Sequence, residues 1–497
     1  MKSILTTLAL FGCTFALAET SSAAKPNILV ILTDDVGWGD YGCYNPTSKI
    51  PTPNIDRLAR EGMRFSNAHT PAALCAPTRY AMLTGNYPWR GRSPNGTWGV
   101  NVPSQLKPGQ QTVAKLLQTA GYRTAMFGKA GTGGFWADSP EAKHKEPLAP
   151  IEWGFDYSFL IPRGHQATPH AFFENGVQVK MAWDVSKVGE RLLGKAVGFL
   201  DDHLARIKSE GRERPFYLHF CTDGAHSPFA PAASLDGKPL KGVTKMTDHT
   251  DMVHETDILT GGLVAALEKR GLLTNTLIIV TSDNGGLPYE RNHGHDAVGG
   301  LRGRKAFIFE GGHRVPFIAR WAGKIPAGAV RNQVVGTLDT VATALELAGV
   351  KVDAEQCLDA VSLVPVLLGT RDDKNPVRAD LLVQSSPGRD ADDDGGFSSA
   401  DVEITAAEGV KASHKADAKP RLAKHAASDQ MAHALIEGDW KLVIAMTDQP
   451  AALYNLADDL AEKKNQLNDP AQVERVKQMT QRYRDIRSSK RSTNGAL

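Results

Sequence analysis

Residues 27–35 read NILVILTDD, a mostly apolar run that ends on the two aspartates Asp34 and Asp35. A short run of this kind is typical of a buried strand in a parallel sheet. Four further runs share this character: Tyr122–Phe127, Phe216–Cys221, Leu277–Ser282 and Val315–Trp321. Helices are expected between them at Asn54–Glu61, Thr112–Ala120, Val188–Lys208, Asp248–Lys269 and Thr337–Ala348. This alternation predicts an α/β fold with a central, mostly parallel sheet flanked by helices.

Polar residues follow four of these runs: Asp34 and Asp35, Lys129, His226, and Asp283 and Asn284. A single aspartate after a strand is most often a turn or a helix cap. In sheets of this type, however, ligands bind outside the carboxyl ends of the strands. Because four separate strands deliver such side chains to one edge, we expect them to form a shared site.

The residue types in this group limit its chemistry. Carboxylate and amide oxygens are hard ligands, which suit Ca²⁺ or Mg²⁺. The chain has no Cys/His set with zinc spacing. Lysines beside such a metal point to an anionic substrate group. These residues therefore indicate phosphoryl or sulfuryl transfer, and the nucleophile must decide between the two.

Composition excludes other classes of protein. The chain has 497 residues with 57 Lys+Arg and 55 Asp+Glu, a net charge of +2. A balance this close to neutral gives no reason to expect a nucleic-acid partner. Five cysteines are too few for a disulfide scaffold at this length. Four of them lie after the expected signal peptide. These four could form two disulfides or remain free buried thiols.

The N-terminus is expected to be a signal peptide, residues 1–24, with cleavage near 18–24. A lipoprotein with lipidated Cys13 is the alternative. No later stretch reaches 18 apolar residues, so no membrane span is expected. The signal peptide implies that the protein is exported, periplasmic or secreted. Residues 25–370 are expected to form the catalytic domain. Residues 371–497 would form a smaller subdomain, with an Asp/Ala-rich insertion at about 385–430.

The segment Cys75–Arg79 reads CAPTR, and several other blocks accompany it in order along the chain. It resembles the C-x-P-x-R signature of type I sulfatases, in which a maturation enzyme oxidises the cysteine to formylglycine. The other matching blocks are Asp34-Asp35, Gly121–Lys129, Ala225–Pro228, Ser282–Gly285, Leu301–Lys305, Glu310–Pro316 and Gly438–Leu442. The resemblance covers nearly all of the chain after the signal peptide. It implies an alkaline-phosphatase-like α/β core with a smaller C-terminal α+β subdomain.

The resemblance also implies individual roles, with Cys75, as formylglycine, supplying the nucleophile. The implied calcium ligands are Asp34, Asp35, Asp283, Asn284 and the modified Cys75. Arg79 would orient the hydrated formylglycine. Lys129 and Lys305 would bind sulfate oxygens, and His226 would protonate the leaving oxygen as general acid. The residues expected to line the substrate pocket are His165, His170, Arg302 and His313. The implied partners are a sulfated sugar or polysaccharide and the maturation enzyme.

One block departs from the family pattern. The family has G-K-W-H-x-G, whose histidine is the expected base for releasing sulfate, whereas residues 128–133 read GKAGTG. Gly131 therefore stands where the histidine is expected. Either another group serves, with His69 and His165 as candidates, or turnover relies on water, or the protein is slow or inactive. A sulfatase that only binds sulfated glycans therefore remains an alternative, as does a phosphodiesterase or phosphonate hydrolase of the same superfamily.

A second calcium site is possible in the insertion. The spacing of Asp390, Asp392, Asp394 and Asp401 fits the loop of an EF-hand or of a dockerin-type repeat. The alternative is a solvated acidic loop. If calcium binds there, we expect it to order the insertion and to take no part in the chemistry.

Overall fold

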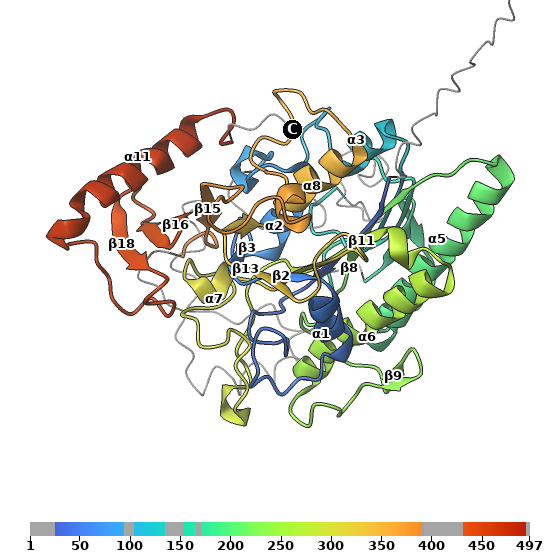
Figure 1. Ribbon diagram of the computed structural model, residues 1–497. Helices are drawn as coiled ribbons and strands as arrows, with labels where there is room; N and C mark the ends of the chain where they lie inside the picture. The colour runs from blue at the N-terminus through green and yellow to red at the C-terminus, as the bar shows by residue number, and fades with distance from the viewer. Residues whose placement is uncertain are drawn as a thin grey trace, which may run out of the picture.

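The computed structural model describes residues 25–93, 104–134, 153–165, 170–389, 391 and 431–493 (Figure 1). Two of the expectations fall on residues outside these ranges. They are the signal peptide at residues 1–24 and the acidic motif with Asp390, Asp392, Asp394 and Asp401.

A ten-stranded sheet lies at the centre of the molecule. Its strands are β1 (Asn27–Thr33), β2 (Met63–Phe65), β4 (Arg123–Lys129), β5 (Tyr157–Ile161), β6 (Phe172–Glu174), β7 (Val177–Val179), β8 (Phe216–Cys221), β11 (Thr276–Ser282), β12 (Phe317–Arg320) and β13 (Ala329–Arg331). Their order is β13-β2-β12-β11-β1-β8-β4-β5-β6-β7. The five strands from β11 to β5 run parallel, which brings their carboxyl ends to one edge. The expected α/β fold with a mostly parallel centre is confirmed.

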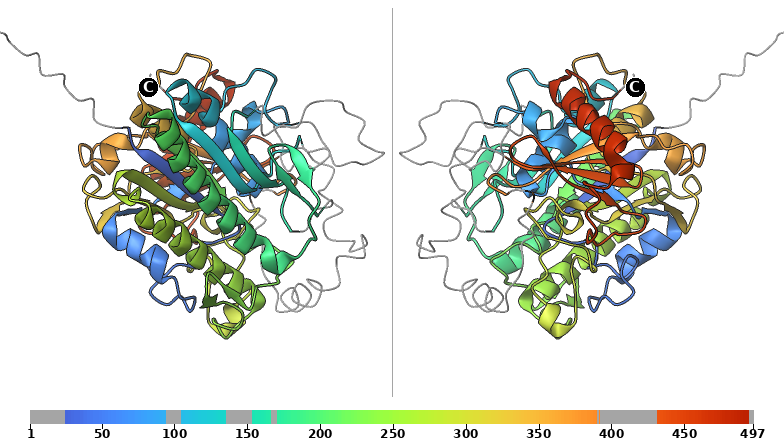
Figure 2. Two further views of the ribbon diagram at one scale, coloured as in Figure 1. Left: turned by 90° about the vertical axis from the view of Figure 1, so that its right-hand side faces the viewer. Right: turned by 90° about the vertical axis from the view of Figure 1, so that its left-hand side faces the viewer.

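Helices cover both faces of this sheet (Figures 1 and 2). They are α1 (Pro53–Glu61), α2 (Cys75–Thr84), α3 (Val113–Thr119), α5 (Val188–Glu210), α6 (Asp248–Lys269), α7 (Glu310–His313), α8 (Asp339–Ala348), α9 (Val364–Leu367) and α11 (Val473–Ser488). Alternate side chains of β1 enter two different cores. Leu29 and Ile31 pack in the core with α1, α5 and α6, whereas Val30 and Leu32 pack in the core with α2, α3 and α8. The sheet is therefore buried on both sides, which explains the continuous apolar runs.

The expected elements agree with the structure except near one edge of the sheet. The strands Asn27–Thr33 and Phe216–Cys221 and the helix Asp248–Lys269 have the expected bounds. The expected strand Val315–Trp321 is shorter, and as β12 it runs antiparallel to β11. The chain between these two strands has no crossover helix, so it stays at the carboxyl edge and returns in the opposite direction.

A second, antiparallel sheet stands beside the first. It has the order β15-β16-β17-β18, formed by Asp380–Gln384, His433–Glu437, Trp440–Ile444 and Pro450–Asn455. Its last two strands pair with each other as a hairpin. Helix α11 packs against this sheet (Figure 2). Side chains of the sheet share one apolar core with α2 and α8, so it is firmly joined to the rest of the fold.

The remaining strands are short. They form two two-stranded sheets, β3 (Ala68–His69) with β14 (Val335–Gly336) and β9 (Ser234–Leu235) with β10 (Lys238–Pro239). Within the described ranges, no helix is long and apolar enough to cross a membrane. Among the described residues, Cys43, Cys75, Cys221 and Cys357 are all free thiols.

Candidate active site

Four polar side chains meet where β1 and β11 end. Thr33 pairs with Ser282 in parallel register, so Asp34 and Asp35 lie beside Asp283 and Asn284. The backbone N–H of Asp35 donates to Asp283 Oδ1 at 3.2 Å, and Asn284 Nδ2 donates to Asp35 Oδ1 at 2.8 Å. All four side chains are buried. The structure therefore brings the expected oxygen ligands into one group.

Three cationic side chains balance these carboxylates. Lys129 Nζ lies 2.6 Å from Asp34 Oδ2, and Lys305 Nζ lies 2.7 Å from Asp35 Oδ2. Arg79 donates to Asp283 Oδ2 from Nε at 2.9 Å and from Nη2 at 2.6 Å, and from Nη1 to the carbonyl of Lys129 at 2.8 Å. Such charge-assisted bonds hold the arginine and the lysines in fixed positions.

The charges perturb the two central carboxyl groups in opposite directions. Burial favours the neutral form of Asp34, but the combined charges of Lys129, His226, Arg79 and Lys305 outweigh it and hold the pKa of Asp34 below its usual range. Burial and the neighbouring charge of Asp34 raise the pKa of Asp283 to about 7, although Arg79 opposes the shift. Negative charge is therefore crowded at Asp283, as expected of a site whose carboxylates are arranged for a cation.

Cys75 is the first residue of α2, and it faces this group. Its Sγ and carboxylate oxygens of Asp34 and Asp283 all lie within 4.8 Å of one another. Two further buried oxygens, Asp34 Oδ1 and Asn284 Oδ1, have no hydrogen-bond partner among the described residues. Buried oxygens without partners are costly unless they bind an ion. The donor set is rich in oxygen and thus fits Ca²⁺ better than a soft metal.

His226 stands at the outer side of the group, in the loop after β8. Its Nε2 lies 3.8 Å from Asp35 Oδ2, and its Nδ1 lies 2.9 Å from the carbonyl of Ser227. Burial lowers the pKa of His226 to about 4, and the charges of Lys305 and Lys129 contribute. All the residues expected to carry the chemistry are thus gathered at one edge of the sheet.

Comparison with known proteins identifies the family of the chain that carries this site. Residues 26–350 match the Sulfatase family model. The chain belongs to the sulfatase family. It is 31% identical over 398 residues to human N-acetylgalactosamine-6-sulfatase, covering 75% of this chain and 72% of the relative. It is 32% identical over 478 residues to bovine arylsulfatase A, covering 91% of this chain and 88% of the relative.

A solved structure supports the same fold. A sulfatase of glycosaminoglycan metabolism from Bacteroides thetaiotaomicron superposes with a TM-score of 0.74 at 23% identity. The match covers 94% of this chain and all of that structure. The expected family and fold are therefore confirmed, and so is the expected enzyme class, because sulfatases are sulfuric ester hydrolases.

The sulfatase does not bring all four expected pocket residues to the group. His165 Nε2 lies 2.8 Å from Asp223 Oδ2, and both side chains are buried. His170 is exposed and stacks on Trp183, with ring centroids 5.3 Å apart. The structure thus places His165 in an ion pair and His170 on the surface.

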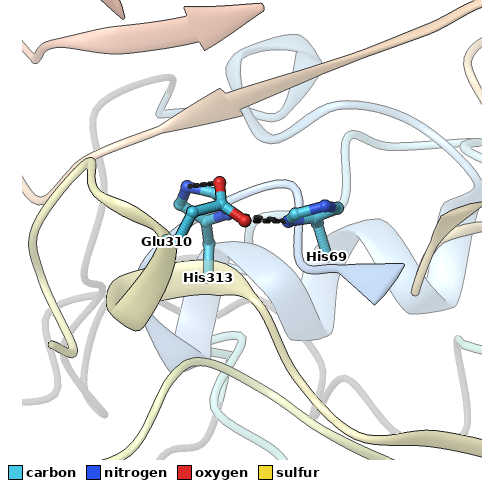
Figure 3. Close-up of side chains that lie close together, drawn as sticks. All are labelled: His69, Glu310 and His313. Atoms are coloured by element: carbon cyan, nitrogen blue, oxygen red, sulfur yellow. Dashed lines mark hydrogen bonds and ion pairs between the residues drawn. The ribbon is translucent and has the colours of Figure 1, made fainter. Parts of the chain in front are cut away.

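Arg302 and His313 differ more clearly from the expectation. Arg302 donates to the hydroxyl of Tyr454 and to the carbonyl of Glu462, both at 3.1 Å, and lies over the ring of Phe309. His313 has no exposed surface and belongs to a buried polar network (Figure 3). Packing against the second sheet buries His313 completely and half-buries Arg302 against Tyr454, and sequence position could not reveal that.

Sequence reasoning missed Asp223. It follows β8 by two residues, so the pattern of an acid after a strand could have identified it. Its partner His165 follows β5, and the ends of these two strands lie on either side of β4. Neither strand's sequence alone indicates that the two side chains form a pair.

Proposed function

We propose that this sulfatase is formylglycine-dependent, binds calcium and hydrolyses sulfate esters of sulfated sugars or polysaccharides. The observation that carries the proposal is Cys75 at the start of α2, beside Asp34 and Asp283 and within a ring of fixed cations. Export fits this function, because the expected signal peptide would take the protein to extracellular polysaccharide. The maturation enzyme would act on Cys75 as its partner.

The sugar class is supported by the names of relatives. N-acetylgalactosamine-6-sulfatase is named for a sulfated amino sugar, and a second relative from Bacteroides thetaiotaomicron carries a matching name at 31% identity. These names describe those proteins, and we extend only the general class of sulfated carbohydrate to this chain.

Asp34, Asp35, Asp283, Asn284 and the modified Cys75 would hold the calcium ion. A bound Ca²⁺ supplies positive charge that acidifies a coordinated hydroxyl and neutralises an anionic substrate. Formylglycine supplies a hydrated aldehyde as the nucleophile. Lys129 and Lys305 would hold sulfate oxygens in place, because their ammonium groups are fixed by aspartates at the edge of the site.

His226 is suited to give a proton to the leaving oxygen. Its Nε2 faces the Asp35 side of the group, where Lys305 also stands. With its pKa lowered, a protonated His226 gives up its proton readily. The approach of an anionic sulfate ester would favour the protonated form beforehand.

The glycine at position 131 favours a second candidate, a sulfatase that binds glycans without turnover. Gly131 has φ +71°, and a Cβ there would lie 2.9 Å from Arg79 Cδ. The backbone itself is therefore built for glycine at this position. If the protein is active, His165 is better placed than His69 to act as the base. The N–H of Gly131 donates to the carbonyl of Pro162, three residues before His165 in the chain, whereas His69 is held by His313.

Mass spectrometry on the peptide that contains Cys75 tests the proposal. After expression in a host that matures sulfatases, conversion of the thiol to the aldehyde removes about 18 Da. Unmodified thiol under these conditions would contradict the proposal. The matured protein should then cleave aryl sulfates in preference to aryl phosphates, and a preference for phosphate would favour the phosphodiesterase alternative. Glycan binding without sulfate release by matured protein would favour the second candidate.

A further inference from the structure

A buried ionic network joins the second sheet to the candidate active site, and Figure 3 draws three of its residues, His69, Glu310 and His313. Lys441, on β17, has no exposed surface, and its ammonium group contacts three side chains. Its Nζ lies 3.0 Å from Glu310 Oε1, 3.0 Å from His313 Nε2 and 2.8 Å from Glu462 Oε1. Two carboxylates and one imidazole thus surround this buried cation.

The two histidines of the network are neutral hydrogen-bonding groups. His69 Nδ1 lies 3.0 Å from His313 Nδ1, and His69 Nε2 lies 2.8 Å from Asn67 Oδ1. Burial lowers the pKa of His69 to about 3, and burial together with Lys441 lowers the pKa of His313 well below its usual range. His313 Nε2 lies 3.0 Å from Lys441 Nζ and also 3.0 Å from the carbonyl of Ile308. In the tautomer whose Nε2 accepts from Lys441, His313 donates from Nδ1 to His69, which in turn donates to Asn67.

The group of His69, Glu310 and His313 has the residue types of a metal site, but its charges oppose one. Arg314 Nη1 lies 2.7 Å from Glu310 Oε2, and Lys441 occupies the other oxygen. Both carboxylate oxygens are therefore already bound to cations, and a metal ion would have to displace them. We assign the group as an internal ion network.

This network fixes α7, and α7 touches three loops of the active site. The N–H of Gly285 donates to the carbonyl of Gly312 at 2.8 Å, directly after Asn284. The N–H of Gly311 donates to the carbonyl of Arg302 at 2.7 Å, in the loop that carries Lys305. The N–H of Thr70 donates to the carbonyl of His313 at 2.8 Å, in the segment that leads to Cys75.

The contact with the Asn284 loop is unusually close. A Cβ on Gly285 would lie 1.9 Å from the carbonyl oxygen of Gly311, so the two backbones touch directly. A shift of α7 therefore cannot be absorbed by side chains and must move Asn284 and Asp283 as well. Interiors packed this closely transmit displacement.

We propose that Lys441 is a positioning residue for the metal site: it holds α7 through Glu310 and His313, and α7 holds the loop of Asp283 and Asn284. The inference rests on the proposed function, since it concerns the calcium site of that function. It assigns a catalytic purpose to the second sheet, which otherwise supplies none of the proposed ligands. Outer-shell partners of metal ligands affect affinity in the same manner elsewhere.

Calcium affinity of the full chain tests the inference, measured by calorimetry on chelator-treated protein with Cys75 unmodified. We expect Lys441→Met to weaken binding by about 10- to 100-fold. The matched control is Arg90→Met. Arg90 makes a two-point ion pair with buried Asp359 beyond the far end of α2. That variant should lose stability too, yet bind calcium as the unsubstituted protein does.

The outcomes separate the two proposals. Absence of calcium binding by the unsubstituted protein overturns the proposed metal site and this inference with it. Unchanged affinity in Lys441→Met, or equal losses in Lys441→Met and Arg90→Met, overturns the inference alone. If Lys441→Met does not fold, Glu462→Gln leaves the lysine in place and perturbs one of its three partners. An intermediate loss of calcium affinity is then expected, and no loss overturns the inference.

Discussion

Replacing Arg79 by methionine tests whether the carboxylate of Asp283 is placed to bind calcium. The arginine is buried, and it is the cation that contacts Asp283 directly, through two hydrogen bonds. Its removal leaves Asp283 buried beside Asp34, whose own charge is balanced by Lys129. Removing one partner of a buried ion pair costs about 3–5 kcal/mol.

Calcium should offset much of that loss. With chelator present, only the positive charge of Lys129 among the described residues still acts on Asp283 in Arg79→Met, so most of the destabilisation should appear. With saturating calcium, the bound ion takes over the neutralising role, and binding itself adds to stability. At about 2.1 cal/mol/K per residue, the unfolding entropy of a chain this long is about 1 kcal/mol/K, so the loss corresponds to about 3–5 °C.

Thermal melting with chelator and with calcium measures the difference. Arg79→Met should melt about 3–5 °C below the unsubstituted protein in chelator, and the gap should narrow clearly in calcium. Arg90→Met is the control, because its pair with Asp359 is remote from the proposed ligands and its deficit should not respond to calcium. An Arg79→Met deficit that is equal in both buffers would refute the assignment of Asp283 as a calcium ligand.

Three further predictions concern the proposed general acid His226, the close backbone contact at Gly285 and the buried carboxyl group of Glu462. His226→Gln should lower kcat by about 10²–10⁴ on a sulfate ester with a poor leaving group and less on 4-nitrophenyl sulfate, as steady-state kinetics would show; equal losses on both substrates would argue against a general acid. Gly285→Ala should abolish soluble expression because of the 1.9 Å contact, whereas Gly194→Ala, on α5 with open space around it, should be neutral or stabilising by about 1 kcal/mol. Burial raises the pKa of Glu462 to about 7, so the folded state binds the proton of this carboxyl group more tightly than the unfolded state does. The stability that this proton contributes is complete below about pH 4.5 and is lost as the pH rises toward 7. The melting temperature of Glu462→Gln relative to the unsubstituted protein should therefore rise from pH 5 to pH 8, and a flat difference would contradict this shift.

Much of the site could be predicted because its signals are local. Apolar runs identify strands, and a polar residue directly after a run must lie at the carboxyl edge of the sheet. Parallel pairing of β1 with β11 then places Asp34 next to Asp283, although 249 residues separate them. The strand bounds at β1 and β8 were predicted correctly for the same reason.

The contacts of the His313 and Arg302 side chains could not be predicted from local sequence signals. Both lie in blocks near the site, but His313 is buried against Lys441 of the second sheet, and the half-buried Arg302 bonds to Tyr454 and Glu462. The strand β16 was missed because it follows the Asp/Ala-rich insertion, where the apolar pattern is short.

The sequence by itself thus determined the parallel sheet and the residues delivered to its edge, because strand periodicity and strand ends are properties of neighbouring residues. The tertiary structure alone decided that Lys441 meets Glu310 across 131 residues, and that Gly285 touches the backbone of α7. Such contacts depend on how separate elements pack, and buried charges are tolerated only where packing supplies a partner for each of them.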